Sequence, residues 1–208
     1  MLFAKNAPWY IKAVMPSSLI WSLPNADNHV YLTFDDGPHP LATPFVLDCL
    51  KQYNAKATFF CIGKNVVEQP AIYQRILAEG HAVGNHTMNH LNGFKTPAED
   101  YIQNIELAQS HITSHLIRPP YGRIKKSQAQ LIQQLHPQNK IIMWSVLSGD
   151  FDTSLHGSAC FNYVKKYTKS GSIIVFHDSQ KAFERLKVAL PLTLEWLKDN
   201  QYVTATIN

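Results

Sequence analysis

The stretch HVYLTFDDGPHP, residues 29–40, decides how the chain begins to fold. Its first half is rich in β-branched and aromatic residues, which is typical of a buried strand. Its second half carries a Gly-Pro pair that favours a turn directly after that strand. Asp35 and Asp36 stand between the two halves, so two like charges lie side by side where a buried strand ends. Such a pair suggests a chemical function that needs both carboxylates.

The composition indicates one globular domain. The chain has 208 residues, of which 45% are hydrophobic and 11% aromatic, enough to bury one sizeable core. We expect a single domain over 1–208, with 1–28 as an N-terminal extension packed on it. The net charge is only +4, and the 19 Lys and Arg residues are scattered. This distribution argues against a nucleic-acid partner.

The cysteines and the N-terminus bear on disulfides, thiolate metal sites and membrane segments. Three widely spaced cysteines form no C-x-x-C pair, which predicts neither a disulfide framework nor a thiolate metal site. Prolines interrupt the apolar residues of 1–24, so no signal peptide is recognised, and no window approaches the roughly 20 apolar residues of a spanning helix. We expect no membrane insertion. The location is cytoplasmic by default, or extracytoplasmic if a leader has been removed.

Strand-like and helix-like segments alternate along the chain, which predicts a parallel sheet covered by helices, either open or closed into a barrel. Pro191 should kink or split the last helix. The strand-like runs are 30–34, 57–61, 82–85, 116–118, 141–146, 173–176 and 202–206. The helix-like segments are 43–53, 70–79, 97–115, 126–135, 157–168 and 184–198.

Polar side chains follow five of these apolar runs. In parallel α/β architectures the carboxyl ends of the strands meet at one edge, where ligands bind, so these side chains can converge in space. They are Asp35 and Asp36, His86 and His90, Arg118, Asp150, and His177.

The segment GNHTMNH, residues 84–90, places His86 and His90 four positions apart. On a helical turn this spacing lets two imidazoles reach one metal ion, although alone it is a weak signal. His111 and His115 repeat the spacing in a polar segment without a strand end or a carboxylate, and we assign that pair to a solvated helix face.

Five motifs in order give the chain a family resemblance. They are TFDDGP (33–38), HTMNH (86–90), RPPYG (118–122), SGDF (148–151) and IIVFHDS (173–179). This series resembles the polysaccharide deacetylase family, also called the NodB-homology or carbohydrate esterase 4 family. The resemblance implies a distorted (β/α) barrel of about seven parallel strands.

The resemblance also implies a metal site. Asp36, His86 and His90 correspond to three ligands of one divalent ion, which would leave open positions for water and substrate. Zn²⁺ is the default for this ligand set, and Co²⁺, Ni²⁺ or Fe²⁺ would also suit it. Asp35, the neighbour of Asp36, resembles the catalytic base that takes a proton from the attacking water. Arg118 would supply positive charge beside that base.

The other motif residues receive roles in the same way. His177 resembles the general acid that protonates the departing amine, and Asp150 the carboxylate that orients this histidine. The backbone N–H of Tyr121 corresponds to a donor that stabilises the oxyanion.

Pro120, Phe151 and Val175, together with Tyr121, are expected to contact substrate. Phe151 stands where Trp is frequent and Val175 where Leu is usual, which leaves the acyl and sugar preference open.

The resulting hypothesis is a metal-dependent hydrolase that removes N-acetyl groups from amino sugars, such as chitin oligomers or peptidoglycan-type glycans, and releases acetate. Alternatives with the same fold are an O-acetyl esterase acting on acetylxylan or an amidohydrolase acting on another amide. A non-catalytic glycan-binding relic would have lost a ligand or the base, whereas all are present here. Non-haem iron oxygenases also use two histidines and one carboxylate, but they place the carboxylate near the first histidine.

Overall fold

The computed structural model describes residues 16–23 and 27–208. The predicted N-terminal extension, 1–28, therefore falls partly on residues 1–15 and 24–26, which lie outside the described residues. Within the described part of that segment, a short strand, β1 (Leu19–Ile20), pairs with β6 (Lys140–Ile142). Residues 19–20 are thus part of the sheet.

The described residues contain nine strands, seven α-helices and two short 3-10 helices. The remaining strands are β2 (His29–Asp35), β3 (Ala57–Cys61), β4 (Ala82–Asn85), β5 (Leu116–Ile117), β7 (Val146–Leu147), β8 (Ile173–His177) and β9 (Val203–Thr204). The helices are α2 (Ala42–Gln52), α3 (Gly63–Glu68), α4 (Pro70–Ala78), α5 (Ala98–Gln109), α6 (Lys126–Leu135), α7 (Gly157–Tyr167) and α8 (Phe183–Asp199), with the 3-10 helices η1 (Gly93–Lys95) and η2 (Pro120–Gly122).

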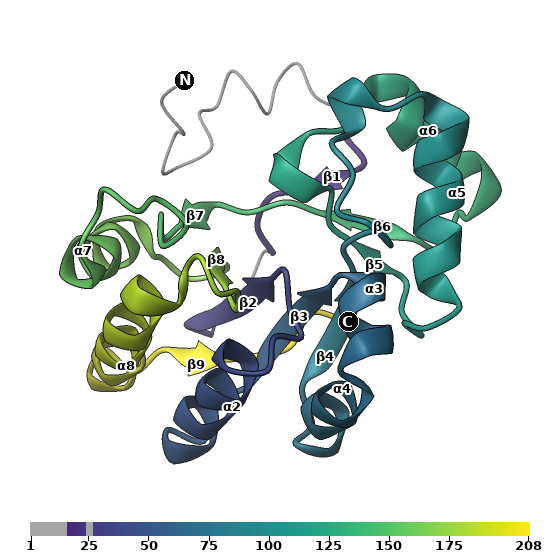
Figure 1. Ribbon diagram of the computed structural model, residues 1–208. Helices are drawn as coiled ribbons and strands as arrows, with labels where there is room; N and C mark the ends of the chain where they lie inside the picture. Colours follow the sequence, from purple (N-terminus) through teal and green to yellow (C-terminus); the bar gives the residue numbers. More distant parts are fainter. Residues whose placement is uncertain (1–15, 24–26) are drawn as a thin grey trace.

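The strands form one curled parallel sheet. Its order is β1-β6-β5-β4-β3-β2-β8-β7, and β9 pairs with the start of β2. β1 and β7 lie at opposite ends of this order, so the sheet is a half-barrel rather than a closed one. Helices α2, α4, α7 and α8 lie around its outer side, and α5 and α6 cover the region of β5 and β6 (Figure 1). The predicted distorted (β/α) barrel is confirmed.

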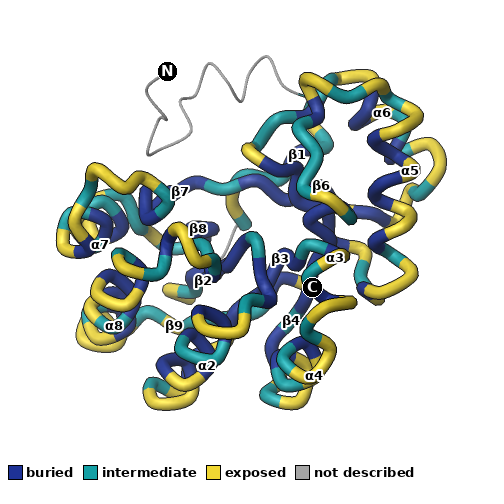
Figure 2. The backbone as a smooth tube through the Cα atoms, viewed as in Figure 1, coloured by how far each residue is buried: buried dark blue, intermediate teal, exposed yellow. Residues whose placement is uncertain are grey.

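The two faces of β2 separate the core from the site. Val30, Leu32 and Phe34 pack in the large cluster that lies under α2 and α8. Tyr31 belongs to a second, smaller cluster inside the curled sheet. Side chains alternate along a strand, so Asp35 points to the same inner side as Tyr31. Figure 2 shows the strands as the most buried part of the chain, with exposed residues on the outer faces of the helices.

Some elements differ from the sequence-based expectations. The run 141–146 is split into β6, which is second from one end of the sheet, and β7, which forms the other end, because the chain crosses the open side of the half-barrel between them. The segment 97–115 is helical only to Gln109, where α5 ends. The last helix, α8, continues through Pro191 and is not split. The carbonyl that loses its partner there belongs to exposed Lys187, where water can satisfy it.

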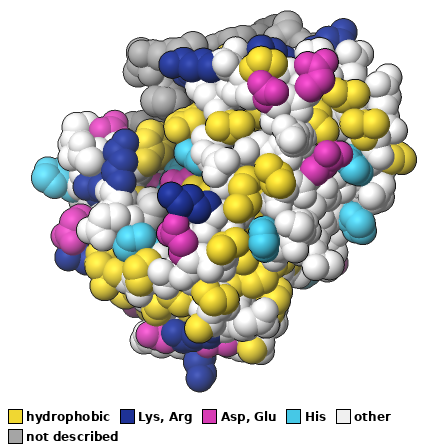
Figure 3. All heavy atoms as spheres, turned by 45° about the vertical axis from the view of Figure 1, so that its right-hand side comes forward, with side chains coloured by type: hydrophobic (Ala, Val, Ile, Leu, Met, Phe, Trp, Pro, Cys, Tyr) yellow, Lys and Arg dark blue, Asp and Glu magenta, His cyan; other side chains and the backbone are white. Residues whose placement is uncertain are grey.

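The surface and the cysteines agree with the sequence. Figure 3 shows Lys and Arg side chains scattered over the visible face, without one large basic patch. Cys49, Cys61 and Cys160 are free and buried. Among the described residues, no helix combines the length and apolarity needed to cross a bilayer.

Candidate active site and metal centre

The carboxyl ends of β2 and β4 bring together three side chains with metal-ligand chemistry. One ligand atom from each of Asp36, His86 and His90 lies within 4.8 Å of the other two. Asp36 Oδ1 is 3.2 Å from His90 Nε2 and 3.6 Å from His86 Nε2. Burial opposes ionisation of Asp36, but the two imidazoles and the charge of His177 outweigh it and hold the pKa of this carboxyl well below its usual value. Among the described residues, this is the one such cluster.

The orientation of His86 fits a metal ligand. Its Nδ1 lies 2.8 Å from the carbonyl oxygen of Arg118, and the side chain is buried. A carbonyl can only accept, so Nδ1 carries the proton and donates it. The neutral ring then directs the lone pair of Nε2 toward Asp36 and His90. This carbonyl-histidine arrangement is the usual way in which a protein fixes the tautomer of a metal-binding histidine.

Asp35 faces a different partner from its neighbour. Its Oδ1 accepts a hydrogen bond of 2.7 Å from Nη1 of Arg118, and both side chains are buried. The guanidinium also donates to Thr33 Oγ1 and to the carbonyl oxygens of Ile142 and Met143. Its carbon lies 3.9 Å from the centre of the Phe60 ring. Arg118 is therefore fixed on all sides, and it holds Asp35 in one orientation.

The ends of β7 and β8 contribute the second charged pair. His177 Nδ1 lies 2.7 Å from Asp150 Oδ1, and the backbone N–H of His177 donates to Asp150 Oδ2 at 2.8 Å. Arg185 Nε donates to the Asp150 carbonyl oxygen at 2.7 Å. Burial lowers the pKa of His177, but the charge and hydrogen bond of Asp150, with smaller contributions from Asp36 and Asp35, raise it to about 9. His177 is therefore protonated at neutral pH.

These groups surround one cavity of about 390 Å³. It collects side chains from the ends of five strands, as the position of the motifs predicted. Its lining comprises Asp35, Asp36, His86, His90, Tyr121, Gly122, Trp144, Leu147, Phe151, Val175, His177, Ser179 and Lys181.

The residues expected to contact substrate occupy different positions. Tyr121 lines the cavity with a half-exposed side chain, and its ring lies 4.5 Å from that of His90. Its φ of 60° is a left-handed conformation, rare for a residue with a side chain. Phe151 packs edge-on against His177, with ring centres 5.2 Å apart. Val175 lines the buried floor. Pro120 is buried and lies outside the lining of the cavity.

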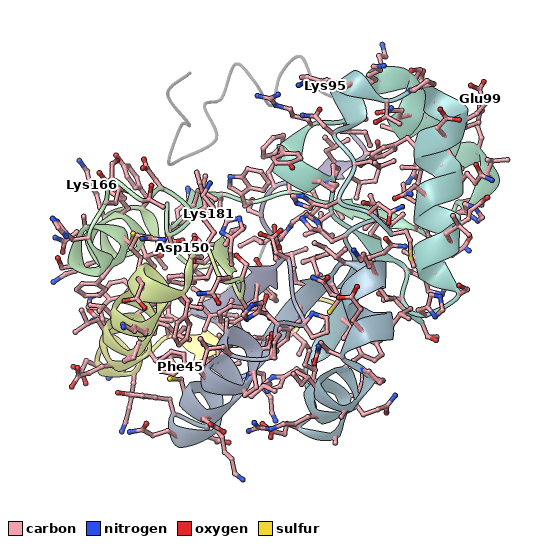
Figure 4. All side chains as sticks on the ribbon, in the orientation of Figure 1. Phe45, Lys95, Glu99, Asp150, Lys166 and Lys181 are labelled. Carbon is pink, nitrogen blue, oxygen red and sulfur yellow. The ribbon has the colours of Figure 1, made fainter. Side chains whose placement is uncertain are left out.

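Several cavity residues carry no motif signal. Trp144 lines the cavity and also packs so closely on Gly122 that a Cβ there would lie 2.4 Å from the indole. Leu147 and Lys181 also line the cavity, together with Ser179, which is the last residue of the fifth motif. Figure 4 shows Lys181 and Asp150 on the side of the molecule that carries α7 and α8. Of these residues, Lys181 could have been suspected, because it lies two positions after the last motif.

The histidine pair chosen as a comparison is exposed, as expected. However, α5 ends before His111 and His115, so neither lies on a helix. Exposure without a neighbouring carboxylate agrees with their exclusion from the site.

Comparison with known proteins decides the family. Residues 23–139 match the family model described as polysaccharide deacetylase. A peptidoglycan-N-acetylglucosamine deacetylase of Bacillus cereus is 34% identical over 204 residues, which cover 95% of each chain. The chain belongs to the polysaccharide deacetylase family. As expected from the motifs, it is a hydrolase of the carbohydrate esterase 4 family, whose deacetylases are metal-dependent.

Two further relatives fit this assignment. A chitooligosaccharide deacetylase of Azorhizobium caulinodans is 37% identical over 160 residues, 72% of this chain and 73% of the relative. The crystal structure of the Bc1960 peptidoglycan N-acetylglucosamine deacetylase, in complex with an N-oxidanyl-benzamide, superposes with a TM-score of 0.83 at 32% identity and covers 91% of both chains. Family membership thus extends over nearly the whole chain.

Proposed function

We propose that this protein removes N-acetyl groups from the amino sugars of a peptidoglycan-type glycan and releases acetate. The observation that carries the proposal is the division of the two adjacent carboxylates. Asp36 faces His86 and His90, while Asp35 faces Arg118, and both line the same cavity. One carboxylate can therefore hold a cation while its neighbour takes a proton.

Asp36, His86 and His90 would hold one divalent ion, with Zn²⁺ as our first choice for this nitrogen and oxygen donor set. When bound, such an ion would polarise the acetyl carbonyl and the attacking water. The tautomer imposed on His86 and the low pKa of Asp36 support this role, because both favour the protonation states that bind metals.

Asp35 is suited to act as the base. Arg118 occupies its Oδ1, which leaves Oδ2 to receive the proton of the attacking water. Three further hydrogen bonds hold the guanidinium itself, so the direction of this carboxylate is fixed before substrate binds. We assign the N–H of Tyr121 to the developing oxyanion, because Tyr121 lines the cavity in a left-handed conformation.

His177 is suited to act as the acid. Its Nδ1–H donates to Asp150, and the imidazole lines the cavity, so Nε2–H is the group that can reach a leaving nitrogen. An amide nitrogen leaves only after it has gained a proton, and a histidine whose pKa is raised to about 9 carries that proton at neutral pH. Phe151 and Val175 would shape the acyl side of the pocket.

Lys181 favours an acidic glycan over a neutral one. It lines the cavity, and among the described residues it forms no ion pair. A carboxylate on the substrate would supply its partner. Peptidoglycan strands carry carboxylates next to their acetylated amino sugars, whereas chitin oligomers carry none. The Bacillus cereus relative that matches 95% of this chain is also named for peptidoglycan.

The test is acetate release by purified protein that has been stripped with a chelator and then supplied with Zn²⁺ or Co²⁺. The substrates are peptidoglycan fragments, chitin oligomers and acetylxylan. We expect metal-dependent release from the first substrate, and loss of release in Asp35→Asn and His86→Ala. Release from acetylxylan alone would favour the esterase alternative. Normal turnover by Asp35→Asn would refute its role as the base.

A further inference from the structure

The turn after β2 is anchored on one buried side chain that the proposed mechanism does not use. Gly37 N–H donates to Asp178 Oδ1 at 3.1 Å. His39 N–H donates to Thr43 Oγ1 at 2.7 Å, and the Thr43 hydroxyl donates to Asp178 Oδ2 at 2.5 Å. Pro38 lies between the two and has no N–H. Every N–H of residues 37–39 is thus held by Asp178, either directly or through Thr43.

Asp178 also bonds to the turn on the other side of Asp36. Its backbone N–H donates to the carbonyl oxygen of Asp35 at 3.1 Å. Asp178 therefore forms hydrogen bonds with the peptide groups before and after Asp36. The carbonyl oxygen of Asp36 itself accepts a hydrogen bond of 2.7 Å from Asn65 Nδ2. These bonds fix the backbone from which the Asp36 carboxylate projects.

The backbone of Asp36 needs such support. Its φ of 82° is left-handed, a conformation that a residue with a Cβ adopts only when its surroundings enforce it. The strand direction would otherwise carry Asp36 to the outer side of the sheet, opposite to Asp35. The left-handed turn instead places its carboxylate within reach of His86 and His90.

The fit between Asp178 and the turn is close. Asp178 and Thr43 are fully buried. A Cβ at Gly37 would lie 2.0 Å from Asp178 Oδ2, so the carboxyl occupies the space that any side chain at position 37 would need. Burial raises the pKa of Asp178 to about 8, although the bond from Thr43 opposes this. Burying a carboxyl group is unfavourable, so packing alone does not explain why Asp178 stands at this position.

We propose that Asp178, with Thr43, is a positioning pair that sets the direction of the Asp36 carboxylate and thereby the metal affinity of the site. The inference rests on the proposed function, because it assumes that Asp36 binds the ion. It makes Asp178 a positioning residue, since Asp178 itself does not line the cavity and contacts the turn that carries Asp36. Groups that orient metal ligands typically influence affinity or activity by about 10- to 100-fold.

The experiment measures zinc affinity of chelator-treated protein by competition with a fluorescent chelator, and separately kcat and KM for acetate release. Asp178→Ala should weaken zinc binding by about 10- to 100-fold and lower kcat at limiting zinc, with little change in KM. Asp178→Asn should retain most of the affinity. Its amide oxygen can still accept from Gly37, and its NH₂ group can donate to Thr43 Oγ1, which has room to accept a second bond.

A matched control separates positioning from stability. Leu190→Ala truncates a fully buried side chain of α8 and lowers stability without touching the turn. It should leave the zinc affinity of the folded protein unchanged. Wild-type zinc affinity in folded Asp178→Ala would overturn the inference.

If Asp178→Ala does not fold, Thr43→Val tests the inference instead. It removes only the hydroxyl that joins His39 N–H to Asp178. Weaker zinc binding in Thr43→Val supports the inference, and unchanged binding overturns it. Failure of the wild-type protein to bind zinc or release acetate would instead refute the proposed function.

Discussion

The charge of Asp150 sets the pH range in which His177 can act as an acid, and Asp150→Asn tests this. The substitution preserves shape and one acceptor oxygen, but it removes the negative charge 2.7 Å from His177 Nδ1. Asp150 is fully buried, so water does not screen this interaction. Burial by itself lowers the pKa of His177. The value of about 9 therefore depends on Asp150, and it should fall in the variant.

The size of the change follows from the hydrogen bond. A bond to a charged group contributes about 1.5–3 kcal/mol, and one pKa unit corresponds to about 1.36 kcal/mol. The pKa of His177 should thus fall by about 1–2 units in Asp150→Asn, to about 7–8.

The raised pKa of His177 also stabilises the fold. The proton contributes about 3 kcal/mol that is fully present below pH 6.5 and is lost as the pH rises through about 9. Asp150→Asn removes roughly half or more of this contribution. The free energy of unfolding of Asp150→Asn should therefore fall furthest below that of the wild type near pH 6, and the difference should shrink toward pH 10.

The assay is the pH dependence of kcat together with urea denaturation at both pH values. If His177 acts as the acid, the alkaline limb of the pH profile of kcat should shift to a pH lower by about 1–2 units, while KM changes little. Asp152→Asn is the matched control, because it removes the same charge from an exposed residue two positions away. Its alkaline limb should coincide with that of the wild type. An unshifted limb in Asp150→Asn would refute the assigned role of the pair.

Three other predictions test the remainder of the site. Zn²⁺ at about 100 times its Kd should add about 2.7 kcal/mol to the free energy of unfolding, measured as a rise in Tm that His86→Ala abolishes. Arg118→Met should lower the free energy of unfolding in urea by about 3–5 kcal/mol, because it leaves the Asp35 carboxylate buried without its partner; a loss below about 1 kcal/mol would contradict this reasoning. Lys181→Glu should raise KM for a glycan that bears carboxylates about fivefold at low salt, equivalent to about 1 kcal/mol, while KM for a neutral oligomer stays constant. Lys166→Glu, on the outer helix α7, is the matched control for charge and should change neither KM.

The sequence predicted the catalytic edge of the sheet because its signals are local. Apolar runs that end on Asp, His or Arg mark strand ends, and parallel topology brings those ends together. The cluster of Asp36, His86 and His90 follows from this rule, although Asp36 and His86 lie 50 positions apart in the sequence. The same reasoning could not place β1, whose two residues form a strand only because β6 offers an edge. Short edge strands depend on long-range pairing and leave little periodic signal.

The walls of the cavity were harder to predict than its chemical groups. Trp144 lies in an apolar run, IIMW, which has the composition of a core strand. The chain leaves β6 at Ile142, and Trp144 then turns toward the cavity beside Gly122. Similarly, Lys181 lies in the turn before α8, and only the path of that turn brings its side chain to the rim. Such positions depend on how the chain crosses between strands.

The two carboxylates have different partners for a simple geometric reason. Asp35 is the last residue of β2 and shares the inner face with Tyr31 and Thr33, so strand alternation directs it to Arg118. Continuing the strand by one residue would turn Asp36 toward the outer helices. The left-handed conformation of Asp36 ends the alternation at that residue and returns the second carboxylate to the cavity. A one-residue shift in the register of β2 would exchange the two faces and remove both carboxylates from their partners at once. The two adjacent carboxylates therefore reach their separate partners only because β2 ends between them.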